Sequence, residues 1–117
     1  MRSDLTSYKI GLYSEFLARW YLRFHGYRIL KKRYVTGKRT GRAEIDIIAK
    51  KGDTIVFFEV KSRQTVSAAW DAITPAQSVR LRRAAETFII KNHWVGNARF
   101  DVIVVCGNKI YWAKNAI

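Results

Sequence analysis

The sequence predicts an α/β fold in which a mixed β-sheet is flanked by helices, in the order helix, three strands, helix, two strands. Three observations favour this class: an apolar stripe at helical spacing opens the chain, runs of Ile, Val and Phe follow between turn residues, and a Thr-Pro helix start precedes a second stripe. The 117 residues, 49% of them hydrophobic, suffice for one core without disulfides. Residues 1–117 are therefore expected to form a single domain.

The first predicted element is a helix over residues 6–25, which Gly26 ends as a C-terminal cap. One side of this helix is a stripe of large apolar residues. A second arc is small and apolar except for Glu15, and a carboxylate there is unfavourable unless a partner pairs with it. The stripe comprises Tyr13, Leu17, Trp20 and Phe24, and the second arc comprises Gly11, Glu15, Ala18 and Leu22.

Strands are predicted where β-branched and aromatic residues gather between turn residues. The pair Gly52-Asp53 suits a two-residue hairpin turn with Gly at its first central position, and Gly107-Asn108 offers a second hairpin turn. Residues 35–43 are predicted to be a flexible basic loop. The five strands are expected over residues 27–34, 44–50, 54–63, 100–106 and 109–113.

A second long helix is predicted to begin near Pro75. The segment from Thr74 to Gln77 has the capping-box pattern, with Pro at the first helical position. Gln77 would also fit as an active-site polar group, but the capping role is favoured. Residues 64–73 are expected to form a loop or a short helix. The long helix presents a buried stripe of Leu81, Ala84, Ala85 and Phe88, and carries Arg80, Arg82 and Arg83 on its other faces.

Charge gives the first indication of function. Twenty-two Lys and Arg against nine Asp and Glu give a formal net charge of +13, and a polyanionic partner would relieve the resulting self-repulsion. Nucleic acid is the commonest such partner. A basic face for a membrane surface is the less favoured alternative, because no helix carries a lipid-facing stripe flanked only by lysines.

Several other classes are disfavoured. With one cysteine, Cys106, the chain can form no intramolecular disulfide and no cysteine metal cluster, and this thiol is expected to be buried and inert. The two histidines, His25 and His93, lack zinc-ligand spacing. We find no signal peptide and no apolar segment long enough to span a bilayer. A cytoplasmic location without membrane contact is therefore expected.

The hairpin register brings acidic residues together. With a two-residue turn, counting outward places Asp46 opposite Glu59 and Glu44 opposite Lys61. Alternation puts all four on one face, and directly opposite side chains have Cβ atoms about 5 Å apart. Facing carboxylates repel each other, so a divalent cation between them is the natural compensation. A cross-strand salt-bridge ladder, Glu44 with Lys61 and Glu59 with an arginine, is the alternative.

These residue types each have a role in phosphodiester hydrolysis. Carboxylate oxygens of Asp46 and Glu59 suit Mg²⁺ or Mn²⁺, which lowers the pKa of a bound water and stabilises charge on the phosphate. Lys61 would orient or deprotonate that water, or stabilise the transition state. The sequence therefore predicts Asp46, Glu59 and Lys61 as catalytic residues.

Both strands of this hairpin resemble the signature of a known family. Residues 43–49, Ala-Glu-Ile-Asp-Ile-Ile-Ala, and residues 56–63, Val-Phe-Phe-Glu-Val-Lys-Ser-Arg, are similar to the YraN-like family. This bacterial group is related to archaeal Holliday-junction resolvases within the PD-(D/E)xK nuclease superfamily. The likeness extends over nearly the whole chain. Further similar segments are Gly11 with residues 15–22, and residues 26–30, 72–85 and 99–102.

The resemblance implies a restriction-endonuclease-like core. In that family pattern, Asp46 and Glu59 match the metal-binding acids, Lys61 matches the catalytic lysine, and Glu15 matches a helix glutamate that can complete the metal shell. The resemblance further implies an endonuclease that depends on Mg²⁺ or Mn²⁺ and acts on structured DNA. Because resolvases act through two active sites, it also implies a homodimer.

Phosphate contacts are expected from basic residues beside the hairpin and on the second helix. A non-catalytic nucleic-acid-binding module with the same fold is the alternative to the endonuclease, and a structural partner of a nucleic-acid machine is a third possibility. The residues themselves leave DNA and RNA both open. The expected phosphate contacts are Lys38, Arg39 and Arg42 in the basic loop, and Arg80 and Arg83 on the second helix.

Two further residues have a favoured structural role. Trp70 is expected to dock onto the core, although a surface Trp can also stack on an exposed base. Asp101, at the start of a buried strand, is expected to pair with Arg99 or with a helix terminus, and a catalytic role for it is disfavoured.

Overall fold

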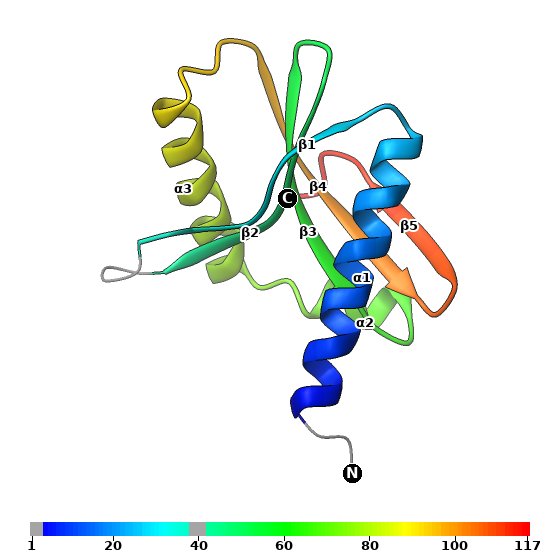
Figure 1. The fold of residues 1–117 in the computed structure, drawn as a ribbon. Helices are drawn as coiled ribbons and strands as arrows, with labels where there is room; N and C mark the ends of the chain where they lie inside the picture. Colours follow the sequence, from blue (N-terminus) through cyan, green and yellow to red (C-terminus); the bar gives the residue numbers. More distant parts are fainter. Residues whose placement is uncertain (1–3, 38–41) are drawn as a thin grey trace.

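Five strands form one sheet in the spatial order β1-β2-β3-β4-β5, which is also their order along the chain (Figure 1). The computed structural model describes residues 4–37 and 42–117. The mixed α/β architecture predicted from the sequence is confirmed. The elements are α1 (Asp4–Phe24), β1 (Arg28–Thr36), β2 (Ala43–Lys51), β3 (Thr54–Ser62), α2 (Val66–Asp71), α3 (Pro75–Lys91), β4 (Asn97–Cys106) and β5 (Lys109–Ala113).

The sheet combines an antiparallel meander with one parallel pair. Strands β1, β2 and β3 pair antiparallel in succession, and β5 returns antiparallel to β4. Strands β3 and β4 run parallel, which requires a crossover, and α2 and α3 supply it. The central strands β3 and β4 are thereby covered on both faces, and their near-continuous apolar sequences reflect this burial.

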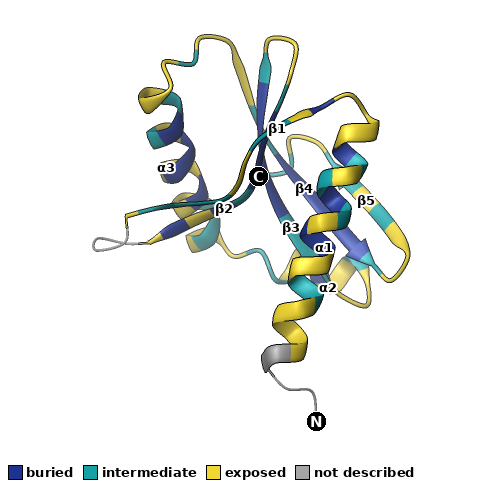
Figure 2. Ribbon diagram, viewed as in Figure 1, coloured by how far each residue is buried: buried dark blue, intermediate teal, exposed yellow. Residues whose placement is uncertain are grey.

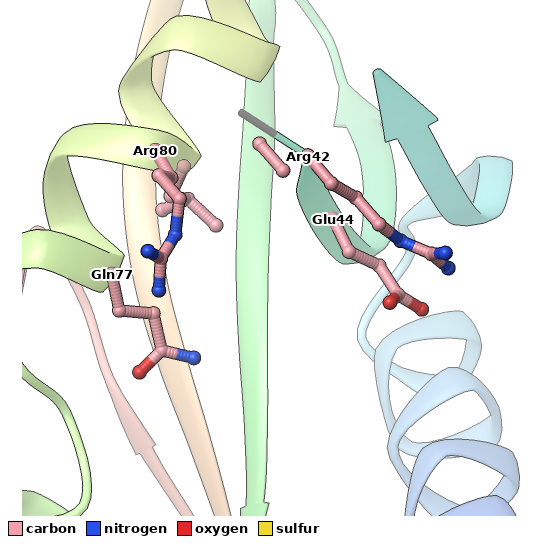
Figure 3. A pocket seen from close by; sticks show the side chains of 6 residues that line it. Arg42, Glu44, Gln77 and Arg80 are labelled. Atoms are coloured by element: carbon pink, nitrogen blue, oxygen red, sulfur yellow. The ribbon is translucent and has the colours of Figure 1, made fainter. Parts of the chain in front are cut away.

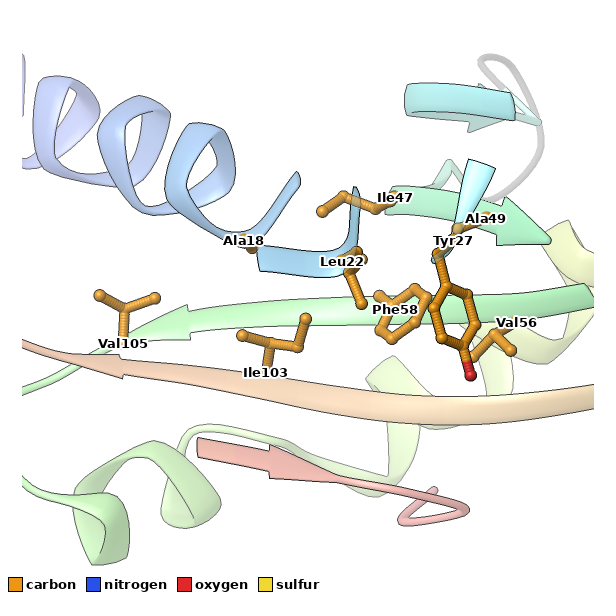
Figure 4. Close-up of a cluster of buried hydrophobic side chains, with 9 residues drawn as sticks. All are labelled: Ala18, Leu22, Tyr27, Ile47, Ala49, Val56, Phe58, Ile103 and Val105. Atoms are coloured by element: carbon orange, nitrogen blue, oxygen red, sulfur yellow. The ribbon is translucent and has the colours of Figure 1, made fainter. Parts of the chain in front are cut away.

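The two long helices cover opposite faces of the sheet, and the buried side chains lie between these layers (Figure 2). Helix α1 contributes Ala18 and Leu22 to one cluster, where they meet Phe58 and Ile103 of the sheet (Figure 4). Helix α3 closes the other face with its predicted stripe of Leu81, Ala84, Ala85 and Phe88, which is confirmed as buried. Within the described residues, no helix is long and apolar enough to cross a bilayer.

Helix α1 packs through its small arc, and its large aromatic residues face outward. Ala18 and Leu22 are fully buried, whereas Tyr13, Trp20 and Phe24 are 60%, 46% and 83% exposed. Small side chains let the helix axis approach the sheet closely, so the arc with the smaller residues packs better. Of the aromatic stripe, Trp20 contacts the rings of Phe16 and Phe24, with centroids 6.5 and 6.1 Å away.

The predicted turns and caps are present with small shifts in element bounds. Gly52 has φ +61° at the β2–β3 turn and Gly26 has φ +86° after α1, conformations that Gly adopts without strain. Helix α3 begins at Pro75, with the Thr74 hydroxyl accepting the Gln77 N–H at 3.1 Å. Strand β1 extends to Thr36, beyond the predicted end at residue 34, and residues 38–41 of the predicted loop lie outside the described residues.

Candidate active site

The candidate site lies where β2 and β3 separate. Their antiparallel ladder begins at the Gly52 turn with the predicted register and ends at the pair Ile47–Phe58. Beyond this pair, the backbone of β2 continues alongside β1, while that of β3 continues alongside β4. Asp46 is the first β2 residue past the ladder, and its Oδ2 accepts the N–H of Val60 at 2.8 Å. The carboxylate thus takes the place of a strand partner.

The early end of this ladder corrects one sequence-based prediction. Glu44 was expected opposite Lys61, but Glu44 instead pairs through its backbone with Val35 of β1, outside the β2–β3 ladder. Lys61 pairs with Glu59 on its own strand, with Nζ 3.2 Å from Oε1. The alternative salt-bridge ladder, which required Glu44 to meet Lys61, is therefore not formed. The reason is that β2 follows β1 where it leaves β3.

Asp46 and Glu59 form a pair of neighbouring carboxyl groups. The charge of Glu59 acts on Asp46, and Glu59 is 6% exposed. Burial, followed by the nearby charge of Glu59, raises the pKa of Asp46 to about 8. Burial also raises the pKa of Glu59, although the Lys61 ammonium opposes this shift. Near neutral pH the pair therefore retains a proton, which a cation bound between the carboxyl groups would displace.

Two donors hold Glu59 in place. Both the Lys61 ammonium and the Gln77 side-chain amide approach Oε1 of Glu59, at 3.2 and 3.1 Å. The Thr74 hydroxyl accepts the N–H of Gln77 as predicted, but the Gln77 side chain reaches the site, the role that was disfavoured. A capping box would turn this amide back to the N–H of Thr74, so the favoured capping role of the side chain is wrong. Gln77 therefore joins the start of α3 to β3.

Glu15 lies on the arc of α1 that faces the sheet, and its carboxylate is bound by Arg33 of β1. The Nε and Nη2 atoms of Arg33 donate to the two Glu15 oxygens at 3.1 and 3.0 Å. The predicted need for a partner is thus met from another element. Among residues 4–37 and 42–117, no group of three or more acidic, His or Cys side chains is placed to hold a metal ion. The charge of Glu15 nevertheless contributes to the raised pKa of Asp46, so its place in the metal shell stays a prediction.

Arg33 also marks a local distortion of the sheet beside the site. Its φ is +53°, a left-handed conformation that is uncommon for a residue with a side chain. Arg33 lies between the β1–β2 pairs Lys32–Ile47 and Tyr34–Ile45, and so faces Asp46 across the two strands. The left-handed residue of β1 is therefore close to the point where β2 leaves β3.

Basic residues line a hollow between α3 and the segment that opens β2. The hollow has a volume of about 230 Å³, and Gln77 and Arg80 extend from α3 toward it while Arg42 and Glu44 flank it from the other side (Figure 3). Arg42 and Arg80, both predicted phosphate contacts, are exposed here. Arg83 is exposed on the next turn of α3. The other two predicted contacts, Lys38 and Arg39, lie outside the described residues.

Asp101 has a structural role, as expected. Its buried carboxylate accepts two bonds from Arg99, both at 2.8 Å, and further bonds from the indole of Trp112 and the N–H of Asn115. These bonds tie the end of the chain to β4. The expected docking of Trp70 onto the core is wrong, because Trp70 is 38% exposed on α2, where its neighbour Ala69 takes the buried position. The Cys106 thiol, expected to be buried, is only partly buried at the end of β4.

The acidic pair has the chemistry of a site for a hard divalent cation. Mg²⁺ is typically held by one or two carboxylates and keeps several waters, so the two carboxyl groups of Asp46 and Glu59 fit such an ion without a third acid. Burial is the main cause of their raised pKa values, and a bound cation would favour the ionised form of both groups. Lys61 supplies a positive charge to one edge of this pair, and the hollow at Arg80 offers room for an anionic group.

Comparison with known proteins places these residues in a family context. Residues 14–105 match the family described as Uncharacterised protein family UPF0102. A UPF0102 protein of Paramagnetospirillum magneticum is 37% identical over 106 residues, which cover 89% of this chain and 82% of that protein. A UPF0102 protein of Rhizobium johnstonii is 36% identical over 115 residues, which cover 92% of this chain and 91% of that protein. A UPF0102 protein of a Bradyrhizobium strain is 40% identical over 103 residues, which cover 86% of this chain and 73% of that protein.

The chain belongs to the UPF0102 family. The resemblance to the YraN-like group seen in the hairpin segments is thereby confirmed at the level of the family. The matched part of this UPF0102 chain runs from Ser14 in α1 to Val105 in β4, and so contains Asp46, Glu59 and Lys61.

Proposed function

We propose that this UPF0102 protein is a nucleic-acid-binding endonuclease that hydrolyses phosphodiester bonds in structured DNA and depends on Mg²⁺ or Mn²⁺. The observation that carries the proposal is the coupled Asp46–Glu59 carboxyl pair with the Lys61 ammonium at Glu59 Oε1. Strongly shifted pKa values in a cluster of this kind are typical of functional sites. A pair kept for stability alone would be better served by apolar side chains.

A restriction-endonuclease-like core is part of the same proposal. An opening helix on one face, an antiparallel meander that carries the acids, and a helical crossover to a parallel strand are consistent with that core. The Glu59-Val60-Lys61 sequence on β3, with Asp46 on β2, supports membership in the PD-(D/E)xK superfamily.

The residues have separate roles in the proposed reaction. Asp46 and Glu59 would hold the cation, which supplies an activated water and neutralises charge on the phosphate when bound. Lys61 would orient the attacking water and donate to a phosphate oxygen, since its Nζ is already held at the acidic pair. Gln77 keeps Glu59 oriented, and so acts as a positioning residue.

Basic residues would hold the nucleic acid against this site. With a net charge of +13, the chain is suited to a polyanion. Arg80 of α3 and Arg42, just before β2, border the same hollow from its two sides. Arg83 extends the basic surface along α3, because residues three apart lie on the same side of a helix. Such contacts fix the position of a substrate backbone and carry little sequence information.

A cleavage screen tests the proposal. Labelled junction, flap, overhang, blunt-duplex and single-stranded DNA would be incubated with Mg²⁺, Mn²⁺ or EDTA. We expect cleavage of a structured substrate with either metal and none with EDTA. Asp46→Asn, Glu59→Gln and Lys61→Met should each abolish it, while Asp53→Asn at the hairpin turn, away from the acidic pair, should not. Cleavage that persists in EDTA, or that survives Glu59→Gln at full rate, would contradict the mechanism.

A non-catalytic nucleic-acid-binding module is the second candidate, and the Glu15–Arg33 pair favours it. Arg33 occupies both carboxylate oxygens of Glu15 and so competes with its entry into the metal shell that the family resemblance implies. This module would bind the same substrates without cutting them. Its signature would be tight binding by the wild type, no product on any substrate with either metal, and unchanged binding by Asp46→Asn.

A further inference from the structure

A groove runs between α1 and the end of β3, on the side of the candidate site opposite the Arg80 hollow. It consists of two adjoining hollows of about 330 and 480 Å³ that share Ile10, Ser62 and Arg63 as walls. We call it the α1–β3 groove. The smaller hollow reaches Lys61 and Gly11, and the larger one reaches Tyr13 and the β4–β5 turn at Gly107.

The α1–β3 groove begins at the candidate site. Lys61 lines its smaller hollow, and the Lys61 ammonium contacts Oε1 of Glu59. Val60 also lines this hollow, and its N–H is bound by Asp46. Glu59 itself faces α3, where Gln77 holds it, so a chain in the groove would approach the acidic pair past Lys61, at the point where β2 leaves β3. The Arg80 hollow approaches the same pair through Gln77.

The lining of the groove is basic and polar, with one aromatic face. None of the described residues that line it is acidic, whereas Lys61 and Arg63 are cationic. Arg63 donates one N–H to the carbonyl of Ser62, and no ion pair found within residues 4–37 and 42–117 involves it. Tyr13 is 60% exposed at the far end. A cationic groove with an exposed aromatic ring is the usual combination for single-stranded nucleic acid.

The dimensions favour one strand over two. Each hollow has the size of a pocket for a small organic ligand, which corresponds to one or two nucleotides. A base-paired duplex would have to approach over the exposed side of α1, where the stripe of large aromatic residues projects. A single strand has flexible backbone torsions and free base faces, and so can follow the groove and stack on Tyr13.

We propose that the α1–β3 groove binds an unpaired nucleic-acid strand that leads away from the acidic pair. This proposal deepens the endonuclease function and rests on it for the meaning of the acidic pair. It names the substrate class as a duplex with a single-stranded branch, such as a tail or flap. The duplex part lies on the basic α3 side near Arg80, and the unpaired branch lies in the groove beside Arg63.

Binding measurements in EDTA test the groove separately from any chemistry. Fluorescence anisotropy would compare a blunt duplex, the same duplex with a tail of about ten unpaired nucleotides, and the tail strand alone. We expect the tailed duplex to bind about tenfold tighter than the blunt duplex, the order expected when one or two bases stack. Equal affinity of the blunt and tailed duplexes for the wild type would overturn the proposal.

Three variants address the groove walls. Gly11→Leu should fill the smaller hollow, because a Cβ at Gly11 meets no atom within 4 Å and the helix tolerates the change. Arg63→Gln removes one of the two cations of the groove and should weaken binding of the tailed duplex. Tyr13→Ala removes the stacking face, and we expect it to weaken binding of the tailed duplex by roughly five- to 150-fold. Each should leave blunt-duplex affinity unchanged. Equal weakening of both ligands would also overturn the proposal.

Matched controls lie away from the groove. Arg28→Gln removes an exposed arginine at the start of β1, and Tyr111→Ala removes a tyrosine that is 43% exposed on β5. Gly11→Ala tests the helix without filling the hollow.

If Gly11→Leu fails to fold, Arg63→Gln and Tyr13→Ala decide the outcome. A preference for the tailed duplex without cleavage would reject the endonuclease and retain the groove, whereas cleavage without that preference would reject the groove alone.

Discussion

The side-chain amide of Gln77 donates to Oε1 of Glu59 at 3.1 Å, so the first turn of α3 is bonded directly to the acidic strand β3. This bond crosses from one layer of the fold to the sheet and ends on a carboxylate that is 6% exposed. Helix α3 thereby fixes the orientation of Glu59 as well as covering the core. Changes at the start of α3 are consequently expected to act on the acidic pair.

Gln77→Ala should weaken catalysis while leaving the fold nearly unchanged. The variant loses one bond to a charged group, which contributes about 1.5–3 kcal/mol to holding Glu59, so cleavage should fall by roughly ten- to 150-fold. The backbone N–H of Gln77 still reaches Thr74, so the cap of α3 remains. The measurement is kcat and KM on the cleaved substrate together with thermal unfolding.

Thr74→Ala is the matched control for this variant. It removes the cap hydroxyl and should cost about 1 kcal/mol of stability, with little change in kcat. Gln77→Glu should be worse than Gln77→Ala, because it places a second carboxylate beside Glu59. A Gln77→Ala enzyme with wild-type kcat would show that the amide bond has no positioning role.

The metal-free protein should lose stability as the pH rises from 5 to 8. In the unfolded chain the Asp46 carboxyl ionises near its ordinary pKa of 3.8, whereas in the folded protein its pKa is about 8. Between these values the folded state binds the extra proton, so the free energy of unfolding falls with pH by up to about 1.4 kcal/mol per unit for this group. Urea unfolding at several pH values in EDTA measures the slope.

Asp46→Asn should flatten this pH dependence. An Asn side chain keeps an oxygen that accepts the N–H of Val60 but cannot ionise, so the variant should exceed the wild type in stability by at least about 1 kcal/mol near pH 8. Adding Mg²⁺ near pH 8 should stabilise the wild type and have little effect on Asp46→Asn, because a bound ion raises stability by mass action. Parallel slopes for the two proteins would contradict the shift at Asp46.

The Glu15–Arg33 pair should contribute to stability as a unit. Arg33→Gln leaves the Glu15 carboxylate, which is 8% exposed, without its bidentate partner. Since the Arg33 side chain is 37% exposed, solvent reduces the penalty, and we expect a loss of about 1–2 kcal/mol. The double variant Glu15→Gln with Arg33→Gln should recover part of this loss, which a double-mutant cycle measures by denaturant unfolding.

The same pair tests whether Glu15 also takes part in metal binding. If Glu15 acts only through Arg33, Glu15→Gln should change stability and leave the metal concentration for half-maximal cleavage unaltered. A rise of tenfold or more in that concentration, without loss of folded protein, would return Glu15 to the metal shell.

Binding to DNA should depend steeply on salt, and the arginines at the Arg80 hollow should account for part of the slope. For each phosphate contact removed, the slope of log affinity against log salt should fall by about 0.9 on duplex DNA. Arg80→Gln and Arg83→Gln together should therefore lower it by nearly two and weaken binding similarly on all sequences. The control is Lys109→Gln, which removes an exposed lysine from the edge strand β5. Binding that does not respond to salt would contradict the phosphate contacts.

The acidic pair should oppose binding when no metal is present. Glu59→Gln deletes a negative charge beside the expected phosphate position, and so should leave the metal-free affinity equal or higher. Anisotropy titrations in EDTA, with the wild type at the same salt concentration, provide the comparison. A clear loss of affinity would show that Glu59 contacts the nucleic acid directly or maintains the fold of the surface.

Local sequence rules predicted the parts of the fold that short-range chemistry determines. The Gly52-Asp53 turn fixed the β2–β3 register, and this register placed Asp46 beside Glu59 as the structure has them. The Thr74 cap located the start of α3, and its apolar stripe identified the buried side. Each of these features depends on residues close together in the sequence, where geometry leaves few alternatives.

The features that were not predicted depend on distant contacts. Both arcs of α1 are apolar, and the choice between them follows from how closely each packs against the sheet, which a single helix pattern does not encode. The pairing of Glu15 with Arg33 spans 18 residues, and so does the Gln77–Glu59 bond. The early end of the β2–β3 ladder arises because β2 continues with β1 past Asp46.

The single parallel pairing in the sheet has a consequence for the order of folding during synthesis. Strands β1, β2 and β3 can assemble as a local meander once residue 62 has left the ribosome, but β3 then has an open edge. Its partner β4 ends at Cys106, so this edge stays unpaired while some forty further residues are made. Open apolar edges promote aggregation and non-local pairs form slowly, so the segment that carries Glu59 and Lys61 is the part of the nascent chain most in need of chaperone protection.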